Sequence, residues 1–164
     1  MAALLSQWLL SEAVMNRIMR IVLGVIVAGV VLFALIQLIP TGVSYTNPPM
    51  VAEPNWDSPQ TRALAQRACF DCHSNETTWP WYAKVAPVSW LVAKDVNEGR
   101  RKLNFSDWGQ SGQSRGDEDP ADEITRNIEN GQMPPWYYTL LHPGARLSAE
   151  EKQQLIDGFK ATLP

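Results

Sequence analysis

Residues 21–39 form a run of nineteen residues without a charge, and Gln37 is the only strongly polar side chain among them. As an α-helix this run would be about 28 Å long, close to the hydrocarbon thickness of a bilayer. A core helix in so small a protein is seldom apolar on every side. The pattern therefore predicts one transmembrane anchor, which we place at residues 18–39, after a cytoplasmic segment at residues 1–17.

The flanks of this run indicate its orientation. Arg17 and Arg20 precede the run, and no basic cluster follows Thr41, so the N-terminus is expected in the cytoplasm and the C-terminal part outside. The alternative is a cleaved signal peptide, whose apolar region is usually shorter and ends in a small-x-small site. The run instead ends in Ile39-Pro40-Thr41-Gly42, which favours an uncleaved anchor.

The first fourteen residues are unusual for a targeting segment, because they contain Glu12 and no basic residue. A chain that begins at Met15 would carry Arg17 and Arg20 directly before the apolar run, as targeting segments commonly do. We therefore interpret residues 1–14 as an extension of the gene prediction.

After the anchor, residues 40–57 contain four prolines and little apolar periodicity, which predicts an extended Pro-rich tether. Residues 58–164 are long enough for one small core. No segment there alternates apolar and polar residues as a strand does, so this domain is expected to be all-α.

Four helices are predicted in this domain. The first three run from Ser58-Pro59 into Cys69, from Val88 to Arg101, and from Pro120 to Asn130 with a stop at Gly131. The fourth begins with the capping box at Ser148 and has an apolar face formed by Leu155, Ile156 and Phe159. Gln110 to Asp119 is expected to be a loop.

The formal net charge of −3 gives no reason to expect nucleic acid as a partner. The chemistry of the chain is concentrated in Cys69-Phe70-Asp71-Cys72-His73, which has the CxxCH pattern of a c-type haem attachment site. Two thiols form thioethers with the two vinyl groups of the porphyrin, and the following imidazole ligates the iron. The motif uses both cysteines of the chain.

Other uses of the cysteine pair are a thioredoxin-like redox pair, half of a zinc site, or a short-loop disulfide. Zinc needs four ligands, and the only other histidine is His142. A thioredoxin-like motif needs a βαβ pattern nearby, which is absent around Cys69. Covalent haem c with its iron is therefore the preferred cofactor, and it would be attached on the periplasmic side of the inner membrane.

The second iron ligand has few candidates outside the anchor. Met50 lies in the Pro-rich segment, whereas Met133 lies in a loop directly after a helix stop and is followed by two prolines that stiffen it. We predict Met133 as the distal ligand. His142 and an open or otherwise filled position stay as alternatives, and Met133 could also be an ordinary core methionine.

Aromatic and basic residues supply further candidates. A haem needs an apolar wall, and Trp79, Trp90 and Trp136 are predicted to contribute to it. The run Arg100-Arg101-Lys102 either pairs with the haem propionates or forms a solvated helix end.

Three blocks of this sequence resemble the bacterial haem-binding domain family of small exported proteins with one CxxCH motif: CFDCHSNETTWPWYAKVAPVSW from Cys69, GRRKLNFSDW from Gly99 and NGQMPPWYYTLLHPGARLS from Asn130. The resemblance covers about residues 56–162. It implies haem on Cys69 and Cys72, His73 as proximal ligand and a redox or haem-binding role. The MPP block is also similar to the distal methionine loop of class I cytochromes c.

These observations favour a small cytochrome c-like helical haem domain, membrane-tethered, with one haem, that passes single electrons between redox partner proteins at the membrane. One alternative is a haem-based sensor or accessory subunit with an exchangeable distal ligand. Another is an enzyme, either a haem peroxidase or a dithiol oxidoreductase. No acid–base pair for peroxide cleavage is visible in the sequence, so an electron carrier is preferred to an enzyme.

Overall fold

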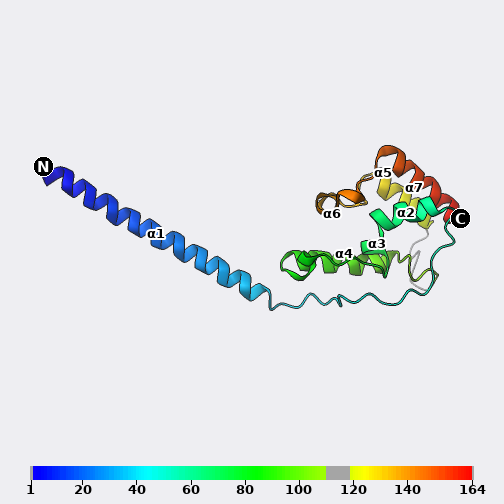
Figure 1. Cartoon of the computed structure of the whole chain (residues 1–164), viewed down its shortest axis with the longest axis horizontal. Helices are drawn as coiled ribbons and strands as arrows, with labels where there is room; N and C mark the ends of the chain where they lie inside the picture. The colour runs from blue at the N-terminus through cyan, green and yellow to red at the C-terminus, as the bar shows by residue number, and fades with distance from the viewer. Residues whose placement is uncertain (1, 110–118, 164) are drawn as a thin grey trace.

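The computed structural model describes residues 2–109 and 119–163, with side chains from residue 14 onward. In chain order its elements are α1 (Ala2–Ile36), α2 (Pro59–Ala68), α3 (Phe70–His73), η1 (Trp81–Lys84), α4 (Val88–Lys102), α5 (Pro120–Glu129), α6 (Trp136–Leu141), η2 (Pro143–Ala145) and α7 (Ala149–Thr162) (Figure 1). No strand forms within these two ranges, so the all-α prediction is confirmed. The predicted loop lies outside the described residues, except for Asp119, which caps α5.

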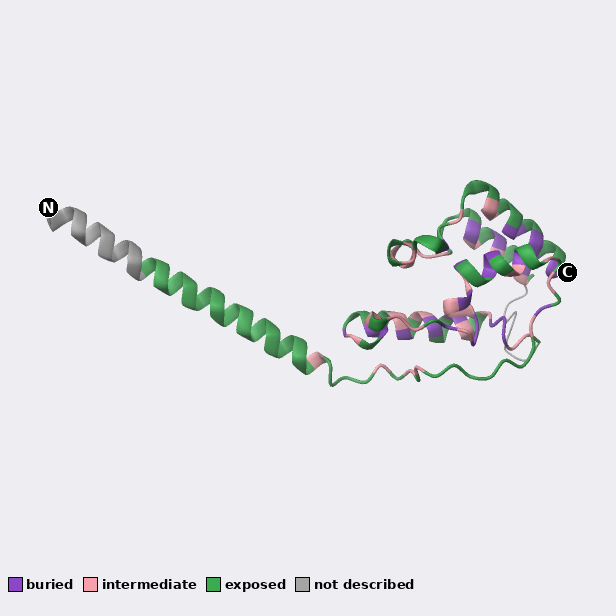
Figure 2. Ribbon diagram, viewed as in Figure 1, coloured by how far each residue is buried: buried purple, intermediate pink, exposed green. Residues whose placement is uncertain are grey.

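Helix α1 stands apart from the other helices. Its part from Val14 to Ile36 is long and apolar enough to cross a membrane, and none of its most apolar stretch is buried inside the protein (Figure 2). Valine, isoleucine and leucine side chains exposed all around a helix are unfavourable in water and favourable in lipid.

The predicted helix starts follow from local hydrogen bonds. The Ser58 hydroxyl accepts from the Thr61 amide at 3.2 Å, with Pro59 at the first helical position. At α7, the Glu151 amide donates to the Ser148 hydroxyl while the Glu151 carboxylate accepts from the Ser148 amide. Both caps confirm the predicted helix boundaries, because each satisfies amides that a helix N-terminus leaves without an intrahelical partner.

The core lies where α2, α5 and α7 pack together. Phe105, from the segment after α4, stacks on Phe159 of α7 with 5.7 Å between ring centroids and on Phe70 of α3 at 5.4 Å. All three phenylalanines are buried, and Trp56 packs against them. This aromatic cluster joins α3 to the α2–α7 core.

Helix α3 is held against α4 by a close backbone approach at Gly99. A Cβ on Gly99 would collide with the carbonyl oxygen of Cys72 and lie 2.9 Å from its carbonyl carbon. Glycine inside a helix lowers the free energy of unfolding by about 1 kcal/mol relative to alanine. Its presence at position 99 is explained by the close approach of the Cys72 carbonyl, which leaves no room for a side chain.

Residues 40–57 are extended and lie along the surface of α4 and the segments around it. The Tyr45 hydroxyl donates to the Ala83 carbonyl at 2.8 Å, and the Asn47 side chain donates to the Thr77 carbonyl at 2.9 Å. Further along, the amide of Trp108 donates to the carbonyl of Ala52 at 2.9 Å. These bonds attach the segment to the helical region at several points.

We predict that Gly99→Ala lowers the free energy of unfolding by about 1–3 kcal/mol, since the new methyl group must push α4 away from the Cys72 carbonyl. Gly144→Ala is the matched control, because a Cβ there meets nothing within 4 Å. Urea unfolding followed by circular dichroism in detergent measures both. Equal stability of the two variants would contradict the tight contact at Gly99.

Candidate functional site

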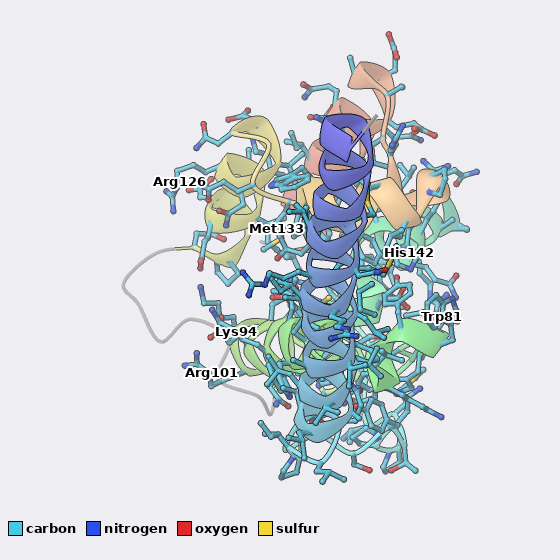
Figure 3. All side chains as sticks on the ribbon, turned by 90° about the vertical axis from the view of Figure 1, so that its left-hand side faces the viewer. Trp81, Lys94, Arg101, Arg126, Met133 and His142 are labelled. Atoms are coloured by element: carbon cyan, nitrogen blue, oxygen red, sulfur yellow. The ribbon has the colours of Figure 1, made fainter. Side chains whose placement is uncertain are left out.

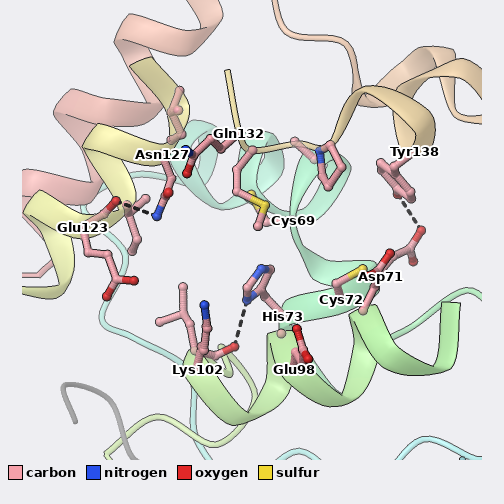
Figure 4. Close-up of a pocket in the computed structure, with 18 of the residues that line it drawn as sticks. Cys69, Asp71, Cys72, His73, Glu98, Lys102, Glu123, Asn127, Gln132 and Tyr138 are labelled. Atoms are coloured by element: carbon pink, nitrogen blue, oxygen red, sulfur yellow. Dashed lines mark hydrogen bonds between the residues drawn. The ribbon is translucent and has the colours of Figure 1, made fainter. Parts of the chain in front are cut away.

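The CxxCH motif lines a cavity of about 290 Å³ between α3 and α4 on one side and α5 and the segment 132–138 on the other (Figure 4). Cys69, Cys72 and His73 come from the first side and Met133 from the other. The remaining lining includes Ala68, Leu103, Phe105, Ile124, Ile128, Pro135 and Phe159, which give the cavity a largely apolar wall. The structure thus brings four of the predicted site residues around one space.

His73 is oriented by its backbone surroundings. Its Nδ1 lies 3.1 Å from the carbonyl oxygen of Leu103, shown as a dashed line in Figure 4. A carbonyl can only accept, so Nδ1 carries the proton and Nε2 keeps its lone pair. Burial lowers the pKa of His73, which favours this neutral form. A neutral imidazole with one nitrogen bound to a carbonyl is the usual arrangement of a metal-ligating histidine.

The two thiols are present as free cysteines and are not joined in a disulfide. Burial raises the pKa of Cys69 to about 12, and burial together with the nearby Asp95 and Asp71 raises that of Cys72 to about 12. Both groups are therefore protonated at neutral pH. Reactive cysteines of redox enzymes have lowered pKa values, so this environment differs from a catalytic dithiol.

Met133 is held by a tight turn after α5. The amides of Gln132 and Met133 both donate to the carbonyl of Asn127, at 2.9 and 3.1 Å. Gly131 takes a positive φ of 67° in this turn, which glycine adopts without strain. The side chain of Met133 is 38% exposed at the edge of the cavity.

His142, the alternative distal ligand, lies outside the cavity lining. Its Nδ1 is 3.0 Å from the carbonyl oxygen of Tyr138 and its Nε2 is 3.1 Å from the Tyr82 hydroxyl. Its ring also stacks on that of Tyr138, with 4.0 Å between centroids. Both ring nitrogens are engaged in the protein, which favours Met133 as the residue available to the cavity.

Two tyrosines of α6 join the two sides of the cavity, a role that the sequence did not suggest. The Tyr138 hydroxyl donates to the Asp71 carboxylate at 2.7 Å, and Tyr137 donates to Asp95 at 3.0 Å. Burial is the main cause that raises the pKa of both tyrosines, with the carboxylates adding to it, so both stay protonated as donors. The one available signal was their position next to the Met-Pro-Pro segment.

The three tryptophans predicted as wall residues do not line this cavity. Trp136 is 71% exposed. The indole nitrogen of Trp79 donates to the Asn47 side chain. The guanidinium carbon of Arg100, on α4, lies 6.0 Å from the centroid of the Trp79 ring. Trp90 is half-buried on α4, and its indole nitrogen is enclosed without a hydrogen-bond partner among the described residues. The aromatic lining comes instead from Phe105, Phe159 and the two α6 tyrosines.

The basic run at the end of α4 is divided between two roles. Lys102 lines the cavity. Arg100 points to the other side, where it donates to the carbonyl of Ser74 at 2.8 Å and to the hydroxyl of Thr77 at 2.8 Å. Lys102 is therefore the member of the run available to an anionic group in the cavity, while Arg100 secures the loop after the CxxCH motif.

The class of protein follows from comparison with known families. The chain belongs to the haem-binding domain family, whose model matches residues 31–161. This match supports a haem cofactor, and it includes the end of α1 and the whole extended segment as well as the helical region. Neither the curated proteins nor the solved structures contain a match to this chain.

The Tyr138–Asp71 contact can be measured by a double-mutant cycle. We predict that Tyr138→Phe and Asp71→Asn show a coupling energy of about 1 kcal/mol in urea unfolding, because Tyr138→Phe removes the donor of this hydrogen bond and Asp71→Asn removes the charge of its acceptor. The cycle separates this bond from the second contact of Asp71, which accepts from the Thr78 amide at 2.8 Å.

A matched cycle of Tyr45→Phe with Asp71→Asn serves as control, since the Tyr45 hydroxyl donates to the Ala83 carbonyl and not to a carboxylate. Strictly additive effects of Tyr138→Phe and Asp71→Asn would rule out the proposed link between the two sides of the cavity.

Proposed function

We propose that this protein is a membrane-anchored monohaem c-type cytochrome-like protein that transfers single electrons. In this proposal Cys69 and Cys72 attach haem covalently, His73 is the proximal iron ligand and Met133 the distal one. The single observation that carries the proposal is that these four side chains line one cavity from two opposed sides.

The donor set fits a haem of this kind. The free Nε2 of His73 is the nitrogen left for iron once Nδ1 is bound to the Leu103 carbonyl. Two protonated thiols on the same short segment match the two vinyl groups, and the apolar wall matches the porphyrin. When bound, the haem supplies an iron that cycles between the ferrous and ferric states.

The chain's own residues would keep that cycle free of ligand exchange. Met133 and His73 would together hold the iron, and a methionine–histidine pair of ligands would raise its reduction potential, which suits electron transfer. The turn at Asn127 holds the Met133 backbone, and the tyrosine bonds to Asp71 and Asp95 limit separation of the two sides.

The environment of the cysteines does not support a dithiol oxidoreductase. Both thiols have raised pKa values of about 12, which leaves very little thiolate at neutral pH. We therefore propose that the cysteines are anchors and not a redox pair.

The apolar helix α1 supports single-pass anchoring in the inner membrane, with the helical region on the periplasmic side where covalent haem is attached. Arg17 and Arg20 precede its apolar stretch and fit this orientation under the positive-inside rule. Anchoring would keep the haem close to redox partners in or on the same membrane and raise their effective concentration.

Covalent attachment is the first test. The full chain, expressed with a c-type cytochrome maturation system, is expected to keep its haem during denaturing electrophoresis, because thioether bonds are covalent and are not broken when the protein unfolds. The double variant Cys69→Ser/Cys72→Ser is expected to lose it. A wild-type protein whose haem separates on denaturation would contradict covalent attachment while leaving haem binding possible.

The distal ligand is the second test. Met133→Ala is expected to abolish the weak long-wavelength band that marks methionine bound to ferric haem and to lower the reduction potential, since a sulfur ligand favours the ferrous state. His142→Ala is the control and is expected to keep the band.

Rapid carbon monoxide binding to the unaltered ferrous protein would contradict a stable methionine ligand and would favour the sensor function. Absence of the band from the unaltered ferric protein, or its retention in Met133→Ala, would likewise contradict the proposed ligand.

A further inference from the structure

The end of α1 is fastened to the helical region by one side chain. Gln37 follows the last residue of α1, and its side-chain oxygen accepts from the Ala86 amide at 2.9 Å. Its side-chain nitrogen lies 3.2 Å from the Ala86 carbonyl and 2.9 Å from that of Phe33. Gln37 thus pairs with both backbone groups of Ala86 while it still bonds the last turn of α1. The start of α4 is thereby placed where the apolar helix ends.

Large apolar side chains are exposed around this junction. We define the apolar face as Trp81, Val88, Leu91, Trp136, Leu140 and Leu141, whose exposed fractions range from 41% to 78%. Trp81 lies five residues before Ala86 in the chain, and Val88 lies two residues after it. Leu38 and Ile39, which follow Gln37 directly, are also exposed, at 78% and 53%.

Helix α6 contributes the other part of this apolar face. The Tyr82 hydroxyl and His142 Nε2, 3.1 Å apart, join η1, which contains Trp81, to the end of α6, which contains Leu141. Figure 1 shows α6 and the start of α4 as the parts of the helical region nearest to α1. In Figure 3, viewed from the side of α1, Trp81 and His142 are both on the right-hand side of the molecule.

Such a concentration of exposed apolar side chains is unfavourable in water and marks an interaction surface. Its position at the end of a membrane-spanning helix specifies the partner, because tryptophan and leucine at that depth meet the interfacial layer of the bilayer. We infer that the apolar face rests on the surface of the membrane that α1 crosses. This inference rests on the proposed anchoring by α1.

Contact with lipid would also orient the cavity. Leu91 lies one helical turn before Asp95, and Trp136 directly precedes Tyr137; Asp95 and Tyr137 both line the cavity. The apolar face therefore borders the cavity, and resting on the bilayer turns this side of the haem site toward the membrane. The core around Phe105 and Phe159 and helix α7 would lie on the side away from lipid.

Photochemical labelling by lipid tests this contact. The haem-loaded full chain is reconstituted in phosphatidylethanolamine–phosphatidylglycerol vesicles that contain a phospholipid with a diazirine near the headgroup end of an acyl chain. After illumination, mass spectrometry maps the adducts. Peptides with Trp81 and with Leu140 and Leu141 are expected to carry lipid, as is α1, whereas peptides of α7 are expected to carry none.

Variants separate this surface contact from anchoring. Trp81→Ser/Leu140→Ser/Leu141→Ser is expected to lose the adducts in the helical region and to keep those on α1. Val51→Ser is the matched control, since Val51 is 62% exposed but lies on the extended segment beside Ser106, and it is expected to keep all adducts.

Adducts on α1 with none on η1 or α6 would overturn the surface contact and leave anchoring intact. A chain without adducts on α1 would overturn the anchoring itself. Labelling of α7 as strong as that of α6 would overturn a defined lipid-facing side. Unchanged haem absorption shows that each variant has kept its fold.

Discussion

The contact of α3 with α4 is the constraint on which the proposed haem site depends. At Gly99 the two backbones approach so closely that no side chain fits between α4 and the Cys72 carbonyl. The same approach brings the end of α4 beside His73, whose Nδ1 meets the Leu103 carbonyl and whose own carbonyl accepts from the Phe105 amide at 2.8 Å. A displacement of α4 would therefore change the direction of the imidazole as well as the packing of the core. Position and orientation of the proposed iron ligand come from one helix–helix contact.

The opposite side of the cavity is attached in a different way. Met133 lies on a short loop between α5 and α6, and its side chain is partly exposed, so packing alone does not hold it. The loop is positioned by the Asn127 carbonyl at one end and by the tyrosine–carboxylate bonds of α6 at the other. Asp71 lies between the two cysteines of the motif, so its bond with Tyr138 links the proximal segment directly to the helix that follows the proposed distal ligand. Hydrogen bonds of this kind permit small adjustments when a large planar group enters, which a fully packed interface does not.

Local features of the sequence were sufficient to predict much of this arrangement. The caps at Ser58 and Ser148 depend on neighbouring residues alone, and the structure confirms both helix starts. The CxxCH motif is similarly local, and in the structure it lines a cavity that Met133 also lines.

Helix α6 was not predicted, because its six residues are too few to show a helical period. The tyrosine–carboxylate pairs join residues far apart in the chain, 67 positions for Tyr138 and Asp71, so no local pattern encodes them. The tryptophans show the same limit: composition indicates that aromatic residues are available, whereas tertiary packing decides that Phe105 and Phe159 line the cavity and Trp136 faces outward.

The extended segment 40–57 connects α1 to the helical region through more contacts than its proline content alone suggests. A free linker of this length would allow the helical region to sample many orientations above a membrane. Here Gln37 and Tyr45 bond to η1 and the residues before α4, and Asn47 bonds to the loop after the CxxCH motif. Arg100 donates to Asn47 as well as to Thr77. Arg100 thus belongs both to the helix that positions His73 and to the network that holds the extended segment. In the proposed membrane-anchored cytochrome, this network would restrict the distance and the orientation of the haem site relative to the bilayer, and both quantities would control how fast an electron reaches a partner in the same membrane.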